Sequence, residues 1–149
     1  MLKLNLPEYS FKIIKDNNAL KIYDEVRKIY VKLSPEEWVR QHFLRYLTEE
    51  KKVPISHIRM EGALLVNNLK KRTHALVFNK DFVPAVLIEF KAPDVLLNEK
   101  VFEQINIYNL IVKTPYIAVT NGMIHYYARL DKENNSVEFI NELPDYCNL

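Results

Sequence analysis

The stretch that most constrains the fold runs from Arg72 to Pro93 and reads RTHALVFNKDFVPAVLIEFKAP. It holds two runs of strand-forming residues around a short polar segment, which predicts two antiparallel strands joined by a turn. The second run, from Pro84 to Lys91, is apolar on both of its alternating faces. This pattern is typical of a central strand that is covered on both sides of its sheet.

The same strand ends on two charged residues. Glu89 and Lys91 are two positions apart, so they share a face of the strand with Leu87. Charges are costly to bury unless they are paired or bind an ion. Because functional sites commonly break the local pattern in this way, we expect a site at this end of the strand.

The register of the predicted hairpin adds a third residue to this site. If the turn spans residues 80–83, counting back along the antiparallel pair places His74 opposite Glu89, with their Cβ atoms about 5 Å apart. We therefore expect His74, Glu89 and Lys91 to form one polar cluster. The cluster could hold a metal ion and a water, or it could be an ion-pair network without a catalytic role.

Two absences exclude several functional classes. The 149 residues include only two glycines, so there is no glycine-rich phosphate loop of the P-loop or dinucleotide-binding kind. There is no CxxC pair for a zinc ribbon or a thioredoxin-type site, and no GxSxG motif.

The compartment is predicted from equally simple features. A single cysteine cannot form an internal disulfide, which fits a reducing environment. The N-terminus lacks a signal-peptide pattern, and no run approaches the roughly 20 apolar residues of a membrane span. We expect a cytoplasmic protein with no membrane association. Its net charge of +2 permits a local basic patch.

Residues 34–50 predict a helix. Ser34 is a suitable N-cap, Pro35 suits the first helical position, and Glu37 completes a capping box. The expected buried stripe consists of Val39, Phe43 and Leu47.

Several basic residues are candidates for DNA contact. Arg40, Gln41 and Arg45 lie off the buried stripe, so we expect either a solvated face or contacts to phosphate, whose geometry suits arginine. Lys71 and Arg72 belong to a polar, basic segment, residues 67–72, which is predicted to be a turn.

Two further segments carry candidate site residues. A strand over 58–66 places Glu61 on a largely apolar face, as an edge residue or as a ligand. A helix over 94–113, capped by Asn98, brings Gln104 and Tyr108 together at i, i+4. The pattern alone favours Tyr108 as a core residue.

The remaining segments complete the predicted architecture. Strands are expected near 115–120, 123–130 and 136–140, with a two-residue hairpin turn at Asn121-Gly122. Asp24 and Arg27 are expected in a surface turn. The order predicts an α/β sandwich around a mixed sheet. We expect one domain over residues 1–149, with an extension at 1–20 and a tail at 145–149.

These motifs resemble a known family. The Glu89-x-Lys91 strand end, the Gln104-x-x-x-Tyr108 helix and the later TNG resemble, in this order, the PD-(D/E)xK nuclease core. The chain is most similar to the N-terminal nuclease domain of type I restriction enzyme R (motor) subunits, and to short stand-alone proteins that carry this domain. The segments that carry the resemblance are IYDEVRKIY, SPEEWVRQHFLRYL, KKRTHALVFNKD, PAVLIEFKAP, FEQINIYNL and PYIAVTNG.

The resemblance implies a restriction-endonuclease-like core, with a central mixed β-sheet flanked by helices. It also implies that Glu89 binds Mg²⁺, that Lys91 orients the attacking water, and that Glu61 is a direct or indirect ligand. Gln104 and Tyr108 would position the site or the DNA backbone. Mg²⁺ suits this chemistry because it prefers oxygen ligands and polarises a phosphoryl oxygen.

This chain departs from the family pattern at one position. Where the family has Asp in an R-x-D-I-V run, the chain has His74. Imidazole is a poor ligand for Mg²⁺ and an acceptable one for Mn²⁺. We expect Mg²⁺-dependent cleavage to be weak or absent unless another carboxylate substitutes, and Asp94 is the candidate.

Two functional hypotheses follow from the resemblance. The first is a metal-dependent DNA endonuclease that hydrolyses phosphodiester bonds, with His74 or Asp94 completing the site. The second is an inactive nuclease-fold module that binds DNA or a partner protein, such as another restriction-system or DNA-processing protein. A third alternative is that Glu89 and Lys91 pair with each other and the protein acts by oligomerising.

Overall fold

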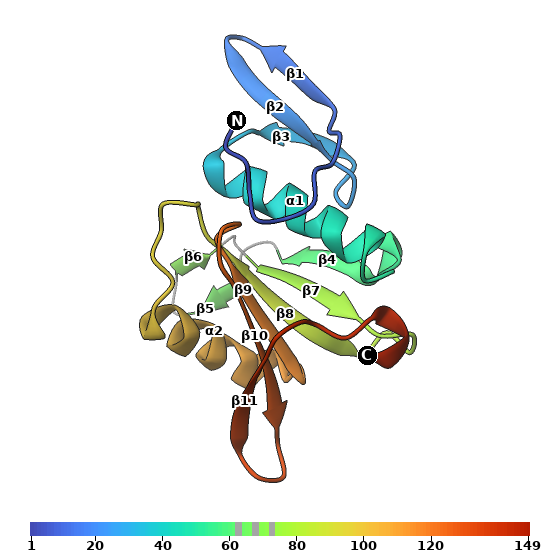
Figure 1. Ribbon diagram of the computed structural model, residues 1–149, viewed down its shortest axis with the longest axis vertical. Helices are drawn as coiled ribbons and strands as arrows, with labels where there is room; N and C mark the ends of the chain where they lie inside the picture. The colour runs from blue at the N-terminus through green and yellow to red at the C-terminus, as the bar shows by residue number, and fades with distance from the viewer. Residues whose placement is uncertain (62–63, 67–68, 72–73) are drawn as a thin grey trace.

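The structure is a computed structural model that describes residues 1–61, 64–66, 69–71 and 74–149, without the side chains of residues 61–71. A six-stranded sheet forms its middle layer, and two helices pack on opposite faces of that sheet (Figure 1). Its strands in spatial order are β11 (Ser136–Ile140), β10 (His125–Asp131), β9 (Tyr116–Thr120), β8 (Pro84–Phe90), β7 (His74–Phe78) and β4 (Ile58–Glu61). The β8–β9 pair is parallel and the other pairs are antiparallel, so the sheet is mixed, as predicted.

Helix α1 (Pro35–Glu49) covers one face of this sheet. The Ser34 hydroxyl accepts a hydrogen bond from the Glu37 backbone N–H at 3.1 Å, which confirms the predicted start of the helix. The predicted stripe is also confirmed, because each of its members is buried in the core beneath the helix: Val39, Phe43 and Leu47.

Helix α2 (Glu99–Val112) covers the opposite face. It begins later than the predicted 94–113, where the Asn98 side chain accepts a hydrogen bond from the Val101 N–H at 3.4 Å. It ends where Lys113 turns into the left-handed region at φ +60°. The strand residues beneath it are Leu76, Leu87, Ile117 and Val119.

The alternation predicted for β8 is confirmed. Val86, Ile88 and Phe90 pack on the α1 side, whereas Leu87 packs on the α2 side. Because side chains alternate along a strand, Glu89 shares the α2 side with Leu87.

A second, smaller sheet packs over the outer side of α1 (Figure 1). It is an antiparallel meander of β1 (Ile13–Asp16), β2 (Ala19–Asp24) and β3 (Ile29–Lys32). Asn17 and Asn18 join its first two strands with φ of 47° and 64°, as a two-residue hairpin turn requires. Helix α1 is therefore covered on two sides.

The segment before the central hairpin differs from the prediction. The single strand expected over 58–66 is two separate strands, β4 and β5 (Leu64–Val66). β5 pairs with β6 (Leu69–Lys71), which lies where the sequence predicted a turn. Gly62 and Ala63, which lie between β4 and β5, are outside the described residues.

The loop between β9 and β10 also differs, because it has four residues, 121–124, instead of two. The Asn121 side chain accepts a hydrogen bond from the Ile124 N–H at 2.8 Å and so shapes the loop. Gly122 has φ +82°, and a Cβ there would lie 2.8 Å from a methyl carbon of Leu4. Glycine is therefore required by both backbone conformation and space.

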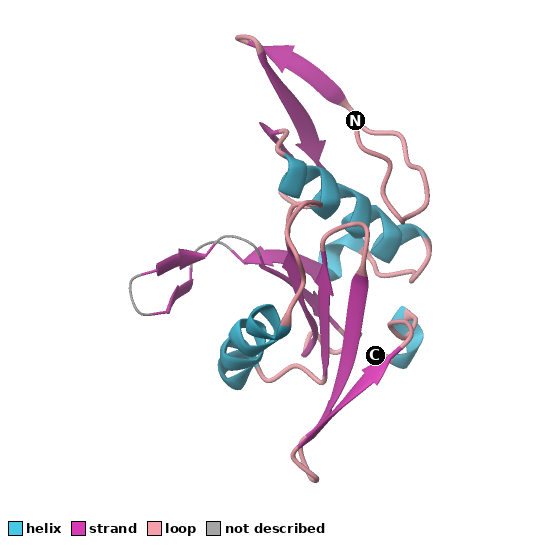
Figure 2. Cartoon of the chain, turned by 60° about the vertical axis from the view of Figure 1, so that its left-hand side comes forward, coloured by secondary structure: helices cyan, strands magenta, loops and turns pink. Residues whose placement is uncertain are grey.

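Two short 3₁₀ turns, η1 (Ile55–His57) and η2 (Tyr146–Asn148), complete the secondary structure described. Among the described helices, none combines the length and the apolar character that crossing a bilayer demands. In a second view, α2 lies on one side of the sheet and the β10–β11 ribbon continues past its end (Figure 2).

Candidate active site

The predicted pairing of His74 with Glu89 is confirmed by the strand register. The two residues are direct partners in the β7–β8 ladder, at the end of the hairpin farthest from its turn. Lys91 follows β8 by one residue, and its backbone N–H donates to the Thr120 carbonyl of β9 at 2.9 Å. The parallel β8–β9 pair therefore holds the strand end that carries both charges.

Both oxygens of the Glu89 carboxylate are in contact with basic side chains. The Nε2 atom of His74 contacts Oε2, and the Lys91 ammonium lies 2.8 Å from Oε1. Burial alone would raise the pKa of Glu89, but its interactions with His74 and then Lys91 outweigh burial and lower that pKa. Glu89 is therefore held as a carboxylate within a compact ion-pair cluster.

Helix α2 adds an aromatic wall to this cluster. The Tyr108 ring stacks on the His74 ring with centroids 4.4 Å apart and planes 4° from parallel. Tyr108 is also buried in the core beneath α2, so it is both a core residue and a neighbour of the site. Gln104 lies one turn earlier, and its side chain is exposed.

Three predicted site residues fall outside what the structure describes at side-chain level. The backbone of Glu61 pairs with His74 in the β4–β7 ladder, so register places it in the same row as Glu89. The side chains of Glu61 and Lys71, and the whole of Arg72, are outside the described residues.

Asp94, the candidate substitute carboxylate, lies elsewhere. It is exposed and lines a hollow formed with Met1, Ser34 and Trp38 near the start of α1. Among described side chains, no group of three or more His, Cys, Asp or Glu residues is arranged to hold a metal ion. The described donors at the site are one imidazole and one carboxylate, which do not fit the oxygen-rich shell that Mg²⁺ prefers.

The prediction that Arg40 and Gln41 lie on a solvated or DNA-facing surface is wrong about their placement. They are 5% and 4% exposed, respectively. The Arg40 guanidinium contacts the Glu37 carboxylate, lies 2.8 Å from Glu36, and sits over the Phe90 ring at 5.3 Å. Contact with DNA through Arg40 would require these ion pairs to break.

The prediction that Asp24 lies in a surface turn is also wrong, because the side chain of Asp24 is completely buried. Its carboxylate accepts hydrogen bonds from the backbone N–H groups of Val26 and Arg27, both at 2.9 Å. The Arg27 side chain donates to Asp24 at 2.5 Å and to Glu37 at 3.1 Å. This network ties the small sheet to the start of α1.

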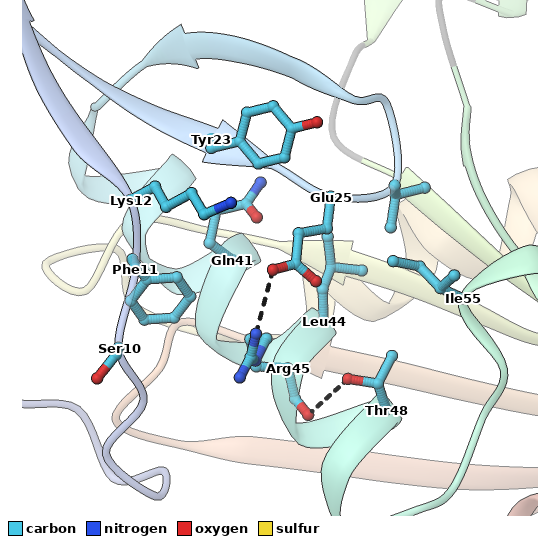
Figure 3. A pocket seen from close by; sticks show the side chains of 11 residues that line it. Ser10, Phe11, Lys12, Tyr23, Glu25, Gln41, Leu44, Arg45, Thr48 and Ile55 are labelled. Atoms are coloured by element: carbon cyan, nitrogen blue, oxygen red, sulfur yellow. Dashed lines mark hydrogen bonds and ion pairs between the residues drawn. The ribbon is translucent and has the colours of Figure 1, made fainter.

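Arg45 lies at the rim of a separate cavity on the outer side of α1. It pairs with Glu25 and Glu49, each at 3.2 Å. The cavity has a volume of about 290 Å³, and Figure 3 shows Arg45 reaching across it toward Glu25, with Gln41 and Tyr23 on its walls. Arg45 is thus less buried than Arg40 and more available to an outside ligand.

Two other histidines, His42 and His125, serve packing roles. The Nδ1–H of His42 donates to the Trp38 carbonyl at 2.9 Å, and the ring lies against the rings of Trp38 and Phe11. His125 contacts the Thr120 hydroxyl at 2.7 Å and the Asn5 carbonyl at 2.8 Å. Burial lowers the pKa of both rings.

Most of the chain, from α1 onward, matches a known protein family. The family described as type I restriction enzyme R protein N terminus (HSDR_N) matches residues 35–144, more than half of the chain. This chain belongs to that family. The match begins with α1 and includes His74, Glu89, Lys91 and Tyr108, and it confirms the family resemblance of the sequence motifs.

A solved structure is also similar to this R-protein N-terminus domain. It is described as a fragment of an HsdR subunit of a type I restriction enzyme from Vibrio vulnificus YJ016. The two share 19% sequence identity over 62% of this chain and 18% of that one, with a TM-score of 0.39. The chain thus spans less than a fifth of that structure. No curated protein matches this chain.

Proposed function

We propose that this R-protein N-terminus domain is a nuclease-fold module that binds DNA and no longer catalyses Mg²⁺-dependent hydrolysis of phosphodiester bonds. The observation that carries the proposal is the closed cluster of His74, Glu89 and Lys91, in which both carboxylate oxygens of Glu89 contact a basic side chain.

Electrostatics supports this proposal. A divalent cation needs more negative charge at its site than the basic groups around it cancel. Lys91 alone balances the charge of Glu89, and the imidazole of His74 adds no negative charge to the described cluster. Aspartate at position 74 would instead make this cluster negative and supply a second oxygen ligand.

A second candidate function is hydrolysis that depends on Mn²⁺. It is favoured by the position of the His74 Nε2 atom, which lies at the Glu89 carboxylate on the same face of the sheet. Imidazole nitrogen is an acceptable donor to Mn²⁺. In this case Lys91 would hold a water or a phosphate oxygen beside the carboxylate.

Binding to DNA is supported by the family and by the mildly basic chain, whose net charge is +2. Arg45, Lys71 and Arg72 are the residues that we propose for phosphate contact. Other proteins of a restriction system are the partners that the family suggests. DNA binding through such contacts weakens steeply as the salt concentration rises.

Isothermal titration calorimetry with Mg²⁺ tests the silenced site. We expect no measurable binding by the native chain, binding by His74→Asp, and loss of that binding in the double variant His74→Asp/Glu89→Gln. Mg²⁺ binding by the native chain that disappears in Glu89→Gln would contradict the proposal. The same titration with Mn²⁺ tests the second candidate.

Fluorescence anisotropy with a labelled DNA duplex tests the binding half of the proposal. We expect affinity to fall as salt rises, and to fall further, by roughly tenfold, in Lys71→Glu/Arg72→Glu. Lys15→Glu/Lys32→Glu, which reverses two exposed lysines on β1 and β3, is the matched control. Equal loss in the control would show that only overall charge matters.

A further inference from the structure

The α2 side of the main sheet carries an apolar surface that no described part of the chain covers. On β11, Val137 is 50% exposed and Phe139 is 62% exposed, and on β10 Tyr126 is 38% exposed. Register pairs Val137 with Leu130 and Phe139 with Ala128, so these side chains continue the sheet face on which α2 packs. Exposed aromatic and aliphatic groups gathered in this way are typical of interaction sites.

This surface is hollowed beside α2. Phe102 of α2 stands edge-on to Tyr126 at 5.6 Å and to Phe139 at 5.3 Å, and forms one wall of the hollow. The hollow has a volume of about 840 Å³, and the sheet residues that line it on the α2 side include Leu130, Val137 and Phe139. We refer to it as the α2–β11 groove.

The carboxylates that line the α2–β11 groove make it acidic. Glu99 and Glu103 line it from α2, and none of its lining residues, all of which the structure describes, is a lysine or an arginine. This arrangement disfavours a nucleic-acid backbone and favours a cationic partner. The two carboxylates are four residues apart on one helix, which separates them by about 6 Å along its axis.

The architecture indicates what shape would fill the groove. Helix α2 covers β7, β8 and β9, while the sheet continues to β10 and β11 without a helix above them (Figures 1 and 2). In layered α/β folds, helices cover the apolar faces of the sheet, so a helix is the element that suits this uncovered part of the face. A strand added to the open edge of β11 would leave the aromatic wall at Phe102 exposed.

We infer that the α2–β11 groove binds an amphipathic helix of a partner protein, which carries two basic residues four positions apart. Its apolar stripe packs on Tyr126, Val137 and Phe139, and its two cations face Glu99 and Glu103. A helix of about four turns would match the length of α2, which has 14 residues. This surface is independent of the His74 cluster and of DNA binding.

Fluorescence anisotropy with a designed probe tests this inference on the full chain. The probe is a labelled amphipathic peptide of about 15 residues, with a leucine stripe and lysines at two positions four apart. The comparison peptide has glutamates at those two positions. We expect the lysine peptide to bind at least roughly tenfold more tightly, with a difference that narrows as salt rises.

Variants of the chain locate the binding. Phe139→Ser should weaken binding of the lysine peptide by roughly tenfold, as loss of a central aromatic anchor does. Leu110→Ser is the matched control, because Leu110 is 71% exposed on α2 but does not line the groove, and it should change affinity by less than about twofold. Glu99→Lys/Glu103→Lys should reverse the preference toward the glutamate peptide.

Three results would overturn the inference. The first is no binding of the lysine peptide, and the second is equal binding of both peptides. The third is sedimentation of the chain as a dimer that Phe139→Ser dissociates, which would assign the groove to a second copy. Thermal melting of each variant establishes that loss of binding is not loss of folding.

Discussion

The imidazole of His74 contacts the carboxylate of Glu89 across the β7–β8 ladder, and the ring of Tyr108 stacks on that imidazole from α2. One substitution relative to the family pattern therefore has a clear structural consequence. A basic group stands beside Glu89 where the resemblance implies an acidic one. Lys91 on the other carboxylate oxygen completes the described cluster, in which two basic side chains contact one carboxylate.

The stack between Tyr108 and His74 predicts the stability of two variants. Tyr108→Ala removes a buried aromatic ring and should lower the free energy of unfolding by about 3–5 kcal/mol. Tyr108→Phe keeps the ring and should cost less than about 1.5 kcal/mol. Urea denaturation followed by circular dichroism measures both. Similar losses in the two variants would show that the hydroxyl, and not the ring, is what matters.

The lowered pKa of Glu89 predicts a dependence of stability on pH. Its pKa in the folded chain is below the ordinary value of 4.5, so the unfolded chain binds this proton more tightly. The contribution of Glu89 to the free energy of unfolding is complete above its pKa in the unfolded chain. It is lost as the pH falls through its pKa in the folded chain.

Glu89→Gln should therefore have a flatter profile of unfolding free energy between about pH 5 and pH 2 than the native chain. Urea denaturation across this range measures the two profiles. Glu8→Gln, which removes an exposed carboxylate paired with Lys3, controls for the loss of one surface charge. Parallel profiles for the native chain and Glu89→Gln would contradict the role assigned to this ion pair.

The buried carboxylate of Asp24 predicts a large effect from a small change. Asp24→Ala leaves Arg27 and two backbone N–H groups without their acceptor, and should cost about 3–5 kcal/mol of unfolding free energy. Asp16→Ala is the control, because Asp16 forms a partly exposed pair with Lys21 and should cost at most about 1 kcal/mol. Comparable losses of unfolding free energy in Asp24→Ala and Asp16→Ala would contradict the role assigned to the Asp24 network in stabilising the packing of α1.

The central cluster could be predicted from sequence because it depends on local rules. Side chains alternate with a period of two, and counting from a turn over 80–83 placed His74 opposite Glu89, as observed. The predicted start of that count was wrong, because the structure pairs Phe78 rather than Asn79 with Pro84, and a β-bulge between Val77 and Phe78 restores the register. Capping residues likewise located the start of both helices at Ser34 and Asn98. No contact between distant segments was needed for these predictions.

The burial of Arg40 and Asp24 could not be predicted in the same way. Helical periodicity identifies the stripe of α1 that faces the main sheet, and assigns charged residues elsewhere to solvent. The small sheet of β1, β2 and β3 packs over that second side (Figure 1), and its Arg27 reaches Glu37 of α1. Arg40 pairs with the same Glu37 and with Glu36 of its own helix. Such tertiary packing leaves no periodic signal in the sequence.

Nicking of supercoiled plasmid in Mg²⁺ by the native chain and by His74→Asp tests most directly whether histidine at position 74 prevents Mg²⁺-dependent hydrolysis. Lys91→Ala in the His74→Asp background serves as the control for a contaminating nuclease. We expect no nicking by the native chain, nicking by His74→Asp, and loss of that activity in the double variant. Nicking by the native chain that disappears in Lys91→Ala would contradict this expectation, because it would show that the site works with histidine at position 74.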